Sequence, residues 1–499
     1  MHHGLFLAPF ACAVALAFAP APAPALATRP LPPGWEWRGS VPVQRVLDFE
    51  SGLEVLAGEY QVWEDREAAD GRRISLHFVI VPSAVGEPEP DPVVILGGGP
   101  GQAATTLVAS TATMVAREHR EILLLDQRGT GRSNPLHCGF ARDASDPQSL
   151  LELSWDLESI RACRAELEKH ADLSLYSTPI AADDLDELCA ALGYDKINLR
   201  GGSYGSRAAL VFLRSHPERV RTATLIGVAP IAFTNPLFHA RGAQDTIDLL
   251  FADCAADPGC RKVLGDLRGQ FETVLARLEK EPARIEVDNP SGKGLVEVVL
   301  TRNGFAEGIR TLMYSLPTQR QVPWLIHRAF EYDYQTVAEA CMRSNGGIRR
   351  QLAWGMLLSV TCAEDVARID PDNIGSVTDG TFLGDVRVRG QMSACAEWPL
   401  GRLPEGYGND VVSDVPVLLF SGTHDPVTPP RWGAQAVENL KHALHVVVPA
   451  AHGVGGDCVD SLERAFLATG SVAGLDASCV ATMRLPRLVL PHAAAGKGD

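Results

Sequence analysis

The sequence predicts an α/β fold with a mostly parallel central sheet, helices on both faces of that sheet and one mainly helical insertion. The first observation is that short apolar runs alternate with amphipathic segments, a pattern typical of βαβ units. The second is that the alternation stops near Thr234 and resumes only at Val415. One sheet is therefore interrupted by a long insertion, and insertions of this kind lie over the carboxyl ends of the strands, where ligands bind.

The predicted elements follow in chain order. Two strands around a polar turn come first, followed by four shorter strands, and the expected ranges are 56–63, 74–81, 92–96, 122–125, 196–199 and 223–227. Helical periodicity separates them at 105–117, 149–170, 181–192 and from Gly205 to about Arg214. After the insertion, strands are expected at 415–420 and 444–448, with helices at 430–440 and 461–467. The expected division is a core of 28–233 and 405–499, with a helical cap of 234–404.

Residues 1–27 differ from the rest of the chain. Leu5 to Ala19 are almost wholly apolar, and Ala25-Leu26-Ala27 fits a small-residue cleavage site, so we expect a signal peptide. The absence of Lys or Arg before the apolar run leaves an uncleaved anchor or an Ala-Pro leader as alternatives. The run is short for a membrane span. We therefore expect a secreted or periplasmic protein without stable membrane association after cleavage.

Composition excludes several classes of protein. The chain has 499 residues, of which 46% are hydrophobic and 21% charged, which is ordinary globular usage and not that of a disordered, collagen-like or coiled-coil chain. The formal net charge is −16, and such a surface repels phosphates, so nucleic acid is not an expected partner. The oligomeric state does not follow from the sequence.

The cysteines favour an oxidising compartment. There are 11, and Cys12 lies in the leader. The others suggest four local disulfides, with two cysteines left over: Cys138–Cys163, Cys254–Cys260, Cys362–Cys395 and Cys458–Cys479, leaving Cys189 and Cys341. Buried free thiols are the alternative. The chain has no CxxC and no HExxH, so we expect neither a metal site nor a cofactor.

Gly201-Gly202-Ser203-Tyr204-Gly205 matches the pattern Gly-x-Ser-x-Gly between an expected strand and an expected helix. The turn is tight, and a side chain at either flanking glycine would clash, while the serine oxygen is exposed above the sheet. The following helix offers its N-terminal N–H groups to a developing oxyanion. Ser203 is therefore the candidate nucleophile, with a chance match as the alternative.

A serine nucleophile needs a base and an orienting acid, which follow it in the order acid, then base, in this type of fold. Asp425 and His452 each come directly after an expected strand in that order. Asp425 could instead be a turn residue before Pro426, and His452 a surface histidine. His424 is the rival base, although it adjoins the acid and would point to the other side of the loop.

The glycine-rich loop at 97–101 follows a strand upstream of Ser203. Gly98 or Gly99, paired with the backbone N–H of Tyr204, is expected to form the oxyanion hole. A relaxed Gly-x-Gly-x-x-Ala with Asp126 at the end of the next strand imitates a dinucleotide-binding fingerprint. However, Pro100 removes an N–H from the loop that should hold a pyrophosphate, and that interpretation leaves the candidate triad unexplained.

Three motifs together carry a family resemblance. Gly-Gly-Gly-Pro-Gly (97–101), Asp-Gln-Arg-Gly-Thr-Gly-Arg-Ser (126–133) and Gly-Gly-Ser-Tyr-Gly (201–205) resemble the proline iminopeptidase and tripeptidyl aminopeptidase family of α/β-hydrolases. Thr-His-Asp-Pro-Val-Thr-Pro (423–429) and Ala-His-Gly (451–453) resemble its secreted, tripeptidyl-aminopeptidase-like branch. The family usually has His where this chain has Gly97. The charged residues of 126–132 are expected to support their loop and not to act in catalysis.

The resemblance implies cleavage behind a free N-terminus, with the substrate amine held by carboxylates of the cap. Segments 361–365 and 395–399 resemble the corresponding cap segments, so the implied amine anchors are Glu364 first, then Asp365 and Glu397. A solvated helix face is the alternative for all three.

The expected function is that of an exported serine hydrolase acting as an aminopeptidase on peptide substrates. Ser203 would attack, His452 would transfer the proton, and Asp425 would orient the imidazole. An esterase or other acyl hydrolase with the same triad is the first alternative, and a non-catalytic binding protein of the same fold is the second. A carboxylate in the pocket would favour the peptidase, and an all-apolar pocket would favour the esterase.

Overall fold

The structure is a computed structural model that describes residues 31–139, 146–152, 155–289, 292 and 294–490. The expected signal peptide, residues 1–27, lies outside these residues. Among the described helices, none combines the length and apolar character needed to cross a bilayer.

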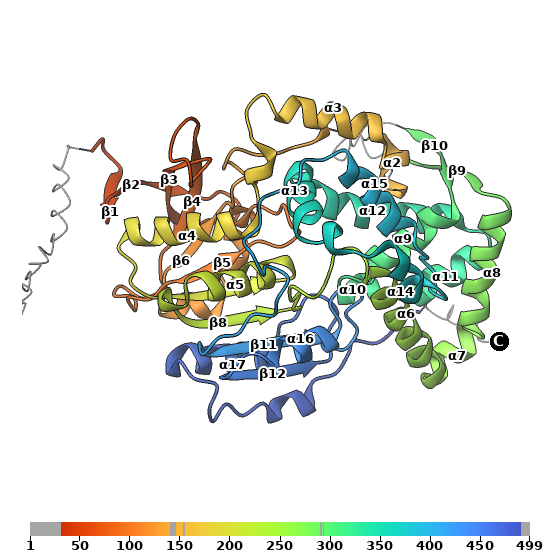
Figure 1. The fold of residues 1–499 in the computed structure, drawn as a ribbon. Coiled ribbons are helices and arrows are strands. Elements are labelled where there is room, and N and C mark those ends of the chain that lie inside the picture. The colour runs from red at the N-terminus through yellow and green to blue at the C-terminus, as the bar shows by residue number, and fades with distance from the viewer. Residues whose placement is uncertain (1–30, 140–145, 153–154, 290–291, 293, 491–499) are drawn as a thin grey trace, which may run out of the picture.

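Ten strands form the central sheet, in the order β1-β2-β3-β4-β6-β5-β7-β8-β11-β12 (Figure 1). Their bounds are β1 Trp35–Arg38, β2 Val41–Leu47, β3 Glu54–Trp63, β4 Arg73–Val81, β5 Val93–Leu96, β6 Ile122–Leu125, β7 Ile197–Gly202, β8 Val220–Ile226, β11 Val417–Gly422 and β12 Ala443–Val448. From β1 to the β4–β6 pair the strands run antiparallel, and from β6 to β12 all neighbours are parallel. The predicted mostly parallel sheet is thus confirmed for its larger half.

Both faces of the parallel half are covered by helices, which is why the central strands β5 and β6 are apolar throughout rather than alternating. All four residues of β6 are buried. Leu123 and Leu125 pack with α4 (Thr178–Leu192) and α5 (Tyr204–Ser215) in one core cluster, whereas Ile122 and Leu124 pack on the opposite face in another. On that opposite face, α17 (Asp457–Thr469) packs over β11 and β12.

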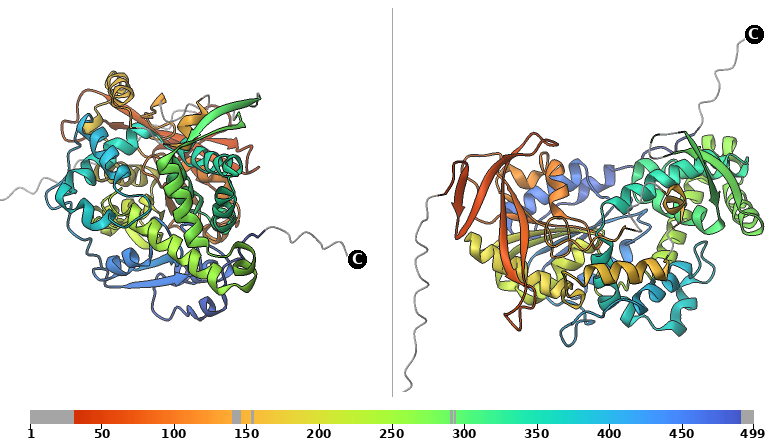
Figure 2. Two further views of the ribbon diagram at one scale, coloured as in Figure 1. Left: turned by 90° about the vertical axis from the view of Figure 1, so that its right-hand side faces the viewer. Right: turned by 90° about the horizontal axis from the view of Figure 1, so that it is seen from above.

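Residues 239–396 form most of a second, mainly helical layer beside the sheet (Figure 1). Its helices are α6 His239–Ala256, α7 Pro258–Leu264, α8 Leu267–Lys280, α9 Arg302–Leu312, α10 Leu316–Gln319, α11 Val322–Phe330, α12 Tyr334–Arg350, α13 Trp354–Glu364, α14 Ile374–Thr378 and α15 Val386–Ala396. This layer has its own hydrophobic core, built from Ile247, Phe271, Phe305 and neighbouring apolar residues. Figure 2 shows it at the opposite end of the molecule from strands β1–β4.

The layer differs from the expected cap in two ways. It contains an antiparallel hairpin, β9 (Ala283–Asp288) with β10 (Leu295–Leu300), which the expectation of a helical insertion missed. In addition, two helices from before the nucleophile join it, because α2 (Pro147–Leu151) packs on α12 and α3 (Leu157–Leu167) packs on α13 and α15. The division at residue 234 therefore follows the chain order only, since α2 and α3, which precede it, pack with the insertion.

One predicted helix is absent. Residues 105–117 form only short pieces, two 3₁₀ turns around the single helical turn α1 (Val108–Thr111). The hydroxyls of Thr106, Ser110 and Thr111 each donate to the carbonyl three residues earlier. Such side-chain bonds compete with helical backbone bonds, which explains why the apolar period here did not produce a regular helix.

The remaining helix in the final part of the chain, α16, spans Pro430–Val437.

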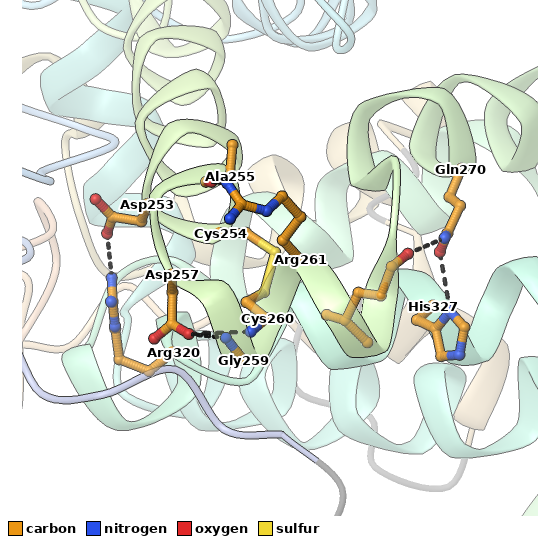
Figure 3. Close-up of a disulfide and its surroundings, with 11 residues drawn as sticks. Asp253, Cys254, Ala255, Asp257, Gly259, Cys260, Arg261, Gln270, Arg320 and His327 are labelled. Carbon is orange, nitrogen blue, oxygen red and sulfur yellow. Dashed lines mark hydrogen bonds and ion pairs between the residues drawn. A yellow bond between two sulfur atoms is a disulfide. The ribbon is translucent and has the colours of Figure 1, made fainter.

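All four predicted disulfides are present: Cys138–Cys163, Cys254–Cys260, Cys362–Cys395 and Cys458–Cys479. Cys189 and Cys341 are buried free thiols, as expected. Figure 3 shows the Cys254–Cys260 bond, which joins the end of α6 to α7. Asp257 caps α7 between the two cysteines, since its Oδ1 accepts from the N–H groups of Gly259 and Cys260. Two of the disulfides, Cys254–Cys260 and Cys362–Cys395, lie wholly within the helical layer.

Candidate active site

Ser203 sits on a sharp turn between β7 and α5 and adopts φ = 55° and ψ = −126°, a strained conformation for a residue with a side chain. The neighbouring glycines make this turn possible. A Cβ at Gly201 would lie 2.1 Å from the carbonyl oxygen of Gly205, and one at Gly205 would lie 2.4 Å from that of Leu96. Gly202 has no such constraint, because its nearest contact would be at 3.9 Å. Gly201 and Gly205 are therefore required by close backbone approach.

Asp425 follows β11 and is 1% exposed. Its Oδ1 accepts hydrogen bonds from the N–H groups of Val427 (2.8 Å) and Thr428 (2.9 Å), and its Oδ2 accepts from the Thr428 hydroxyl (2.8 Å). Burial alone would raise the pKa of Asp425, but the nearby His452 and these N–H donors lower it below its ordinary value. The carboxylate is thus held ionised in one orientation.

His452 follows β12 and pairs with this carboxylate. Its Nδ1 lies 2.8 Å from Asp425 Oδ2 and 3.0 Å from Oδ1. The backbone N–H of His452 donates to the backbone carbonyl of Tyr314 (3.2 Å). The Tyr314 ring meets the imidazole edge-on, at a centroid distance of 5.4 Å. Because Nδ1 faces the carboxylate, Nε2 is the nitrogen left to act on a substrate or nucleophile. His452 and Ser203 line the same cavity, of about 520 Å³.

The rival base, His424, lies elsewhere. Its Nε2 is 3.4 Å from Asp253 of α6, and its Nδ1 bonds the Thr423 hydroxyl at 2.9 Å. Ser203 and His452 line the cavity, and His424 is not among its lining residues. His452, and not His424, is therefore the histidine that pairs with Asp425 beside the cavity.

The glycine-rich loop lies directly beside the nucleophile. Gly98 and Gly99 line the cavity, and a Cβ at Gly98 would be 3.7 Å from the Cβ of Ser203. The Gly98 N–H donates to the side-chain oxygen of Gln102 (3.0 Å). Tyr204 is the first residue of α5, so its N–H has no acceptor within the helix. The loop and the helix start thus bring backbone donors to one side of Ser203.

Gly97, where the family usually has His, has a local reason to be glycine. A Cβ at this position would lie 2.5 Å from the carbonyl oxygen of Gln102, so this loop cannot hold a larger residue without moving. The loop is closed by the hydrogen bond between the Gln102 N–H and the Gly98 carbonyl (3.2 Å). In this chain the close approach of Gln102 to residue 97 therefore favours glycine where the family usually has histidine.

The charged residues of the 126–132 segment hold loops, as expected. Asp126 accepts from the Thr105 N–H (3.0 Å) and the Arg132 N–H (3.1 Å). Arg128 is fully buried and makes a two-pronged contact with Asp184, at 2.6 and 2.8 Å. A buried pair of this geometry braces the structure, because removing either partner leaves an uncompensated charge.

The implied amine anchor Glu364 is not in the cavity, which corrects that expectation. Glu364 is 0% exposed, and its oxygens accept from the Thr178 N–H (2.6 Å), the Thr178 hydroxyl (2.8 Å) and the Tyr407 hydroxyl. The Thr178 hydroxyl also bonds the Tyr204 hydroxyl at 2.7 Å. Burial raises the pKa of Glu364. Its carboxyl is thus committed to a network behind the start of α5 and does not face the substrate space.

The other two candidate anchors differ from each other. Glu397 lies on the surface in a two-pronged pair with Arg161, at 2.7 and 2.9 Å, and does not line the cavity. Asp365 does line the cavity. Its Oδ1 accepts from Arg207 Nη1 (2.6 Å), whereas its Oδ2 has no hydrogen-bond partner among the described residues. Of the three implied anchors, the structure brings only Asp365 to the nucleophile's cavity.

Several cavity residues were missed from the sequence. Thr428 orients Asp425, and the nearby string Asp425-Pro426-Val427-Thr428 was a usable signal, because Asp and Thr three residues apart in a turn can bond each other. By contrast, Glu307, Arg310, Arg349 and Arg387 line the cavity from three different helices, and no motif joins them. Only folding brings them together.

Residues 91–294 match the family model of the alpha/beta hydrolase fold, and residues 380–479 match that of TAP-like proteins. The chain has the α/β-hydrolase fold. The resemblance to proline iminopeptidases and tripeptidyl aminopeptidases that the motifs indicated is thereby confirmed.

Among curated proteins, this chain is 24% identical over 468 residues to the serine protease Hip1 of Mycobacterium tuberculosis, covering 85% of this chain and 87% of that protein. It is 29% identical over 143 residues to the proline iminopeptidase of Neisseria gonorrhoeae, covering 29% of this chain and 34% of that protein. Among solved structures, the proline iminopeptidase of Mycobacterium smegmatis matches with a TM-score of 0.39 and 15% identity, over 83% of this chain and 99% of that one. A thermophilic esterase from Thermogutta terrifontis matches with a TM-score of 0.37 and 15% identity, over the same shares.

Proposed function

We propose that the protein is an exported serine peptidase that releases a residue or short peptide from the free N-terminus of peptides. The observation that carries the proposal is the pairing of Asp425 with His452 beside the strained Ser203 turn, around one cavity. The serine protease and iminopeptidase names of the relatives agree with this reaction class.

In this proposal Ser203 Oγ attacks the scissile carbonyl while His452 Nε2 accepts its proton. Asp425, which is ionised and held by three hydrogen bonds, keeps Nδ1 protonated and stabilises the imidazolium that forms. His452 then gives the proton to the leaving amine, and water hydrolyses the acyl-enzyme by the same steps in reverse order. No metal or cofactor takes part in these steps.

The developing oxyanion is proposed to bind between the Tyr204 N–H and the N–H of Gly98 or Gly99. Tyr204 contributes a donor that the helix itself leaves free, and the positive end of the α5 dipole adds to it. Gly99 is the simpler second donor, since the Gly98 N–H is engaged by Gln102 and would have to exchange that bond for the oxyanion.

The substrate amine is proposed to bind Asp365. Its Oδ2 lacks a hydrogen-bond partner among the described residues, and a buried carboxylate oxygen without a donor is costly. Burial raises the pKa of Asp365 even beside Arg207, so an ammonium at Oδ2 would supply missing stabilisation of the charged form. A charge-assisted bond of this kind distinguishes a free N-terminus from a blocked one.

The esterase alternative is weakened by the character of the cavity. The wall includes two carboxylates, Asp365 and Glu307, and is not the all-apolar pocket that would favour a simple ester. A non-catalytic binding protein would have no need for a strained serine paired with an oriented histidine.

Export is supported by the four disulfides, since such bonds persist in oxidising compartments.

A fluorogenic panel of free and N-acetylated mono-, di- and tripeptides tests the proposal. Acetylation of a good substrate is expected to lower kcat/KM at least about 30-fold, because it removes the charge that Asp365 binds. Asp365→Asn should shrink this discrimination, whereas Glu364→Gln, the matched carboxyl outside the cavity, should preserve it. Equal cleavage of free and blocked peptides would replace the aminopeptidase by the esterase or an endopeptidase.

A further inference from the structure

The cavity beside Ser203 carries an excess of positive charge in a protein whose formal net charge is −16. Its wall includes the guanidinium groups of five arginines and only two carboxylates: Arg200, Arg207, Arg310, Arg349 and Arg387, with Glu307 and Asp365. Two of the arginines have a carboxylate of their own. Arg200 pairs with Glu463 at 2.8 Å, and Arg207 pairs with Asp365 at 2.6 Å.

The other three arginines share a single carboxylate within the cavity, and we call Arg310, Arg349, Arg387 and Glu307 the arginine cluster. Arg310 grips Glu307 with two donors at 2.5 and 2.8 Å, and Arg387 Nη1 reaches the same carboxylate at 2.6 Å. Because three guanidinium groups face one carboxylate, the cluster keeps two positive charges without a counterion among the described lining residues.

Arg349 is the member with the least compensation. It is 7% exposed, its Nη1 donates to the carbonyl of Ser149, and it forms no ion pair with any residue that the structure describes. Burial and the neighbouring guanidinium groups lower its pKa to about 10. The nearest carboxylate beyond Glu307 that affects it is Glu152, which lies outside this cavity and accepts from the Thr301 hydroxyl at 2.6 Å.

The cluster lies next to the catalytic histidine. Arg310 Nη1 donates to the Tyr314 hydroxyl (2.7 Å), and the carbonyl of Tyr314 accepts the His452 N–H (3.2 Å). Arg387 Nε donates to His239 Nδ1 (3.0 Å). Burial, with the charges of Arg387 and Arg310, lowers the pKa of His239 well below its ordinary value, so His239 adds no positive charge and also cannot neutralise any.

We propose that the substrate carries a carboxylate, which Arg349 and Arg387 bind in this cavity while Ser203 attacks. A guanidinium offers donors in a planar fork that matches a carboxylate, and an uncompensated buried charge gains most from such a partner. The inference rests on the proposed serine-hydrolase function and narrows its substrate class. The carboxylate has two sources in a peptide, an acidic side chain or the free C-terminus of a short peptide.

Matched substrate pairs test this and separate the two sources. One pair of peptides differs by Glu against Gln, a second by a free against an amidated C-terminus, and a third pair consists of aryl esters, a hemisuccinate against a butyrate. In the wild-type protein at least one pair should show a preference of about 10-fold or more in kcat/KM for the anionic member, equivalent to about 1.4 kcal/mol. The peptide pair that shows it identifies the source.

The variants decide whether the cluster is responsible. Arg349→Gln should reduce the preference to below about 3-fold by lowering kcat/KM for the anionic member, and Arg349→Lys should retain part of the preference. Arg343→Gln, an exposed position on the same helix, is the matched control and should keep the full preference. If Arg349→Gln does not fold, the partly exposed Arg387→Gln must lower the preference instead.

The proposal is overturned if no pair shows a preference for the anion, or if the preference persists in the folded Arg349 or Arg387 variants. Labelling of Ser203 by a fluorophosphonate probe is measured on the same samples. Normal labelling with no anionic preference refutes the carboxylate inference alone, whereas absent labelling and absent turnover of every pair refute the serine hydrolase itself.

Discussion

Ser203, Asp425 and His452 come from three loops at the carboxyl edge of the parallel strands, and the rest of the site positions them. Thr428 donates both its N–H and its hydroxyl to Asp425, and Tyr314 accepts the backbone N–H of His452. Gly227, at the end of β8, leaves room for the imidazole, because a Cβ there would lie 3.2 Å from the His452 ring. These contacts fix the acid–base pair before any substrate binds.

Ser203→Ala is expected to keep the fold and remove turnover. The side chain loses one oxygen on a half-buried turn that lines the cavity, so the core is unaffected, while loss of a triad member lowers kcat by about 10⁴- to 10⁶-fold. The measurement is kcat of purified wild-type and variant protein on the best peptide of the panel, with circular dichroism as the fold control. More than about a tenth of wild-type activity in the variant would reject Ser203 as the nucleophile.

Glu307 gives a pH-dependent prediction about stability. Burial would raise its pKa, but Arg310 and Arg387 lower it from 4.5 to about 2. Its contribution is therefore complete above pH 4.5 and is lost as the pH falls toward 2. Glu307→Gln should lower the free energy of unfolding by about 3 kcal/mol at neutral pH, because it leaves the buried guanidinium groups unpaired.

The Tm difference between wild type and Glu307→Gln, measured from pH 7 down to pH 3, tests this prediction. The difference should narrow below pH 4.5, because the unfolded wild-type chain takes up a proton at Glu307 that the folded protein, with its lowered pKa, does not. A constant difference across this range would mean that Glu307 is not ionised in the folded protein.

At the residue level, the sequence predicts candidates where chemistry dictates their order along the chain, and it does not predict contacts that only packing decides. Gly-x-Ser-x-Gly and the later Asp and His each follow a strand, so their meeting at one sheet edge could be inferred. Glu364 and Asp365 are adjacent in the chain, yet only Asp365 lines the cavity, and nothing in the sequence distinguishes the two. The arginine cluster needs the tertiary fold to exist at all.

At the scale of elements, the β7–α5 turn carries the clearest constraint. A Cβ at Gly201 or Gly205 would lie only 2.1 or 2.4 Å from a backbone carbonyl oxygen, so both positions require glycine. Gly202, between them, has no such close contact. Composition and local hydrogen bonds explain which predicted elements are present in the structure. Strands β5 and β6 are short, apolar and buried, so composition identified them, whereas the 105–117 segment has helical periodicity but its hydroxyls break the helix.

Gly201→Ala and Gly202→Ala form a matched pair for this turn. Gly201→Ala should destabilise the protein by at least about 2 kcal/mol, because its Cβ would overlap the Gly205 carbonyl. Gly202→Ala should change stability by less than about 0.5 kcal/mol, since its Cβ would make only an ordinary van der Waals contact, at 3.9 Å. Thermal unfolding of both variants is the measurement. Equal Tm values for the two variants would show that the turn is not as tight as the structure has it.

At the scale of the whole molecule, the chain consists of a ten-stranded sheet and a helical layer that together enclose the cavity. Hydrophobic periodicity predicted most strands of the sheet along the chain, but not β1, β2 or the spatial order of the strands. The hairpin β9–β10 and the packing of α2 and α3 onto the insertion could not be predicted, because short amphipathic segments do not reveal which layer they join.

The disulfides give a whole-molecule prediction. The eight paired cysteines should resist alkylation until the purified protein is reduced, and Cys189 and Cys341 should react only once it is unfolded, because both are buried. Mass spectrometry after alkylation with and without reductant, in native and denaturing buffer, distinguishes these groups. Alkylation of most of the paired cysteines in denaturant without reductant would contradict the pairing and remove the main support for export.

The most direct test of the central claim is to locate the covalent adduct that a fluorophosphonate forms with the active protein. The account predicts one adduct per chain, on Ser203, formed in parallel with loss of peptidase activity and strongly slowed in His452→Ala, since that variant lacks the base. An adduct on another serine, or full peptidase activity in protein whose Ser203 is modified, would contradict it.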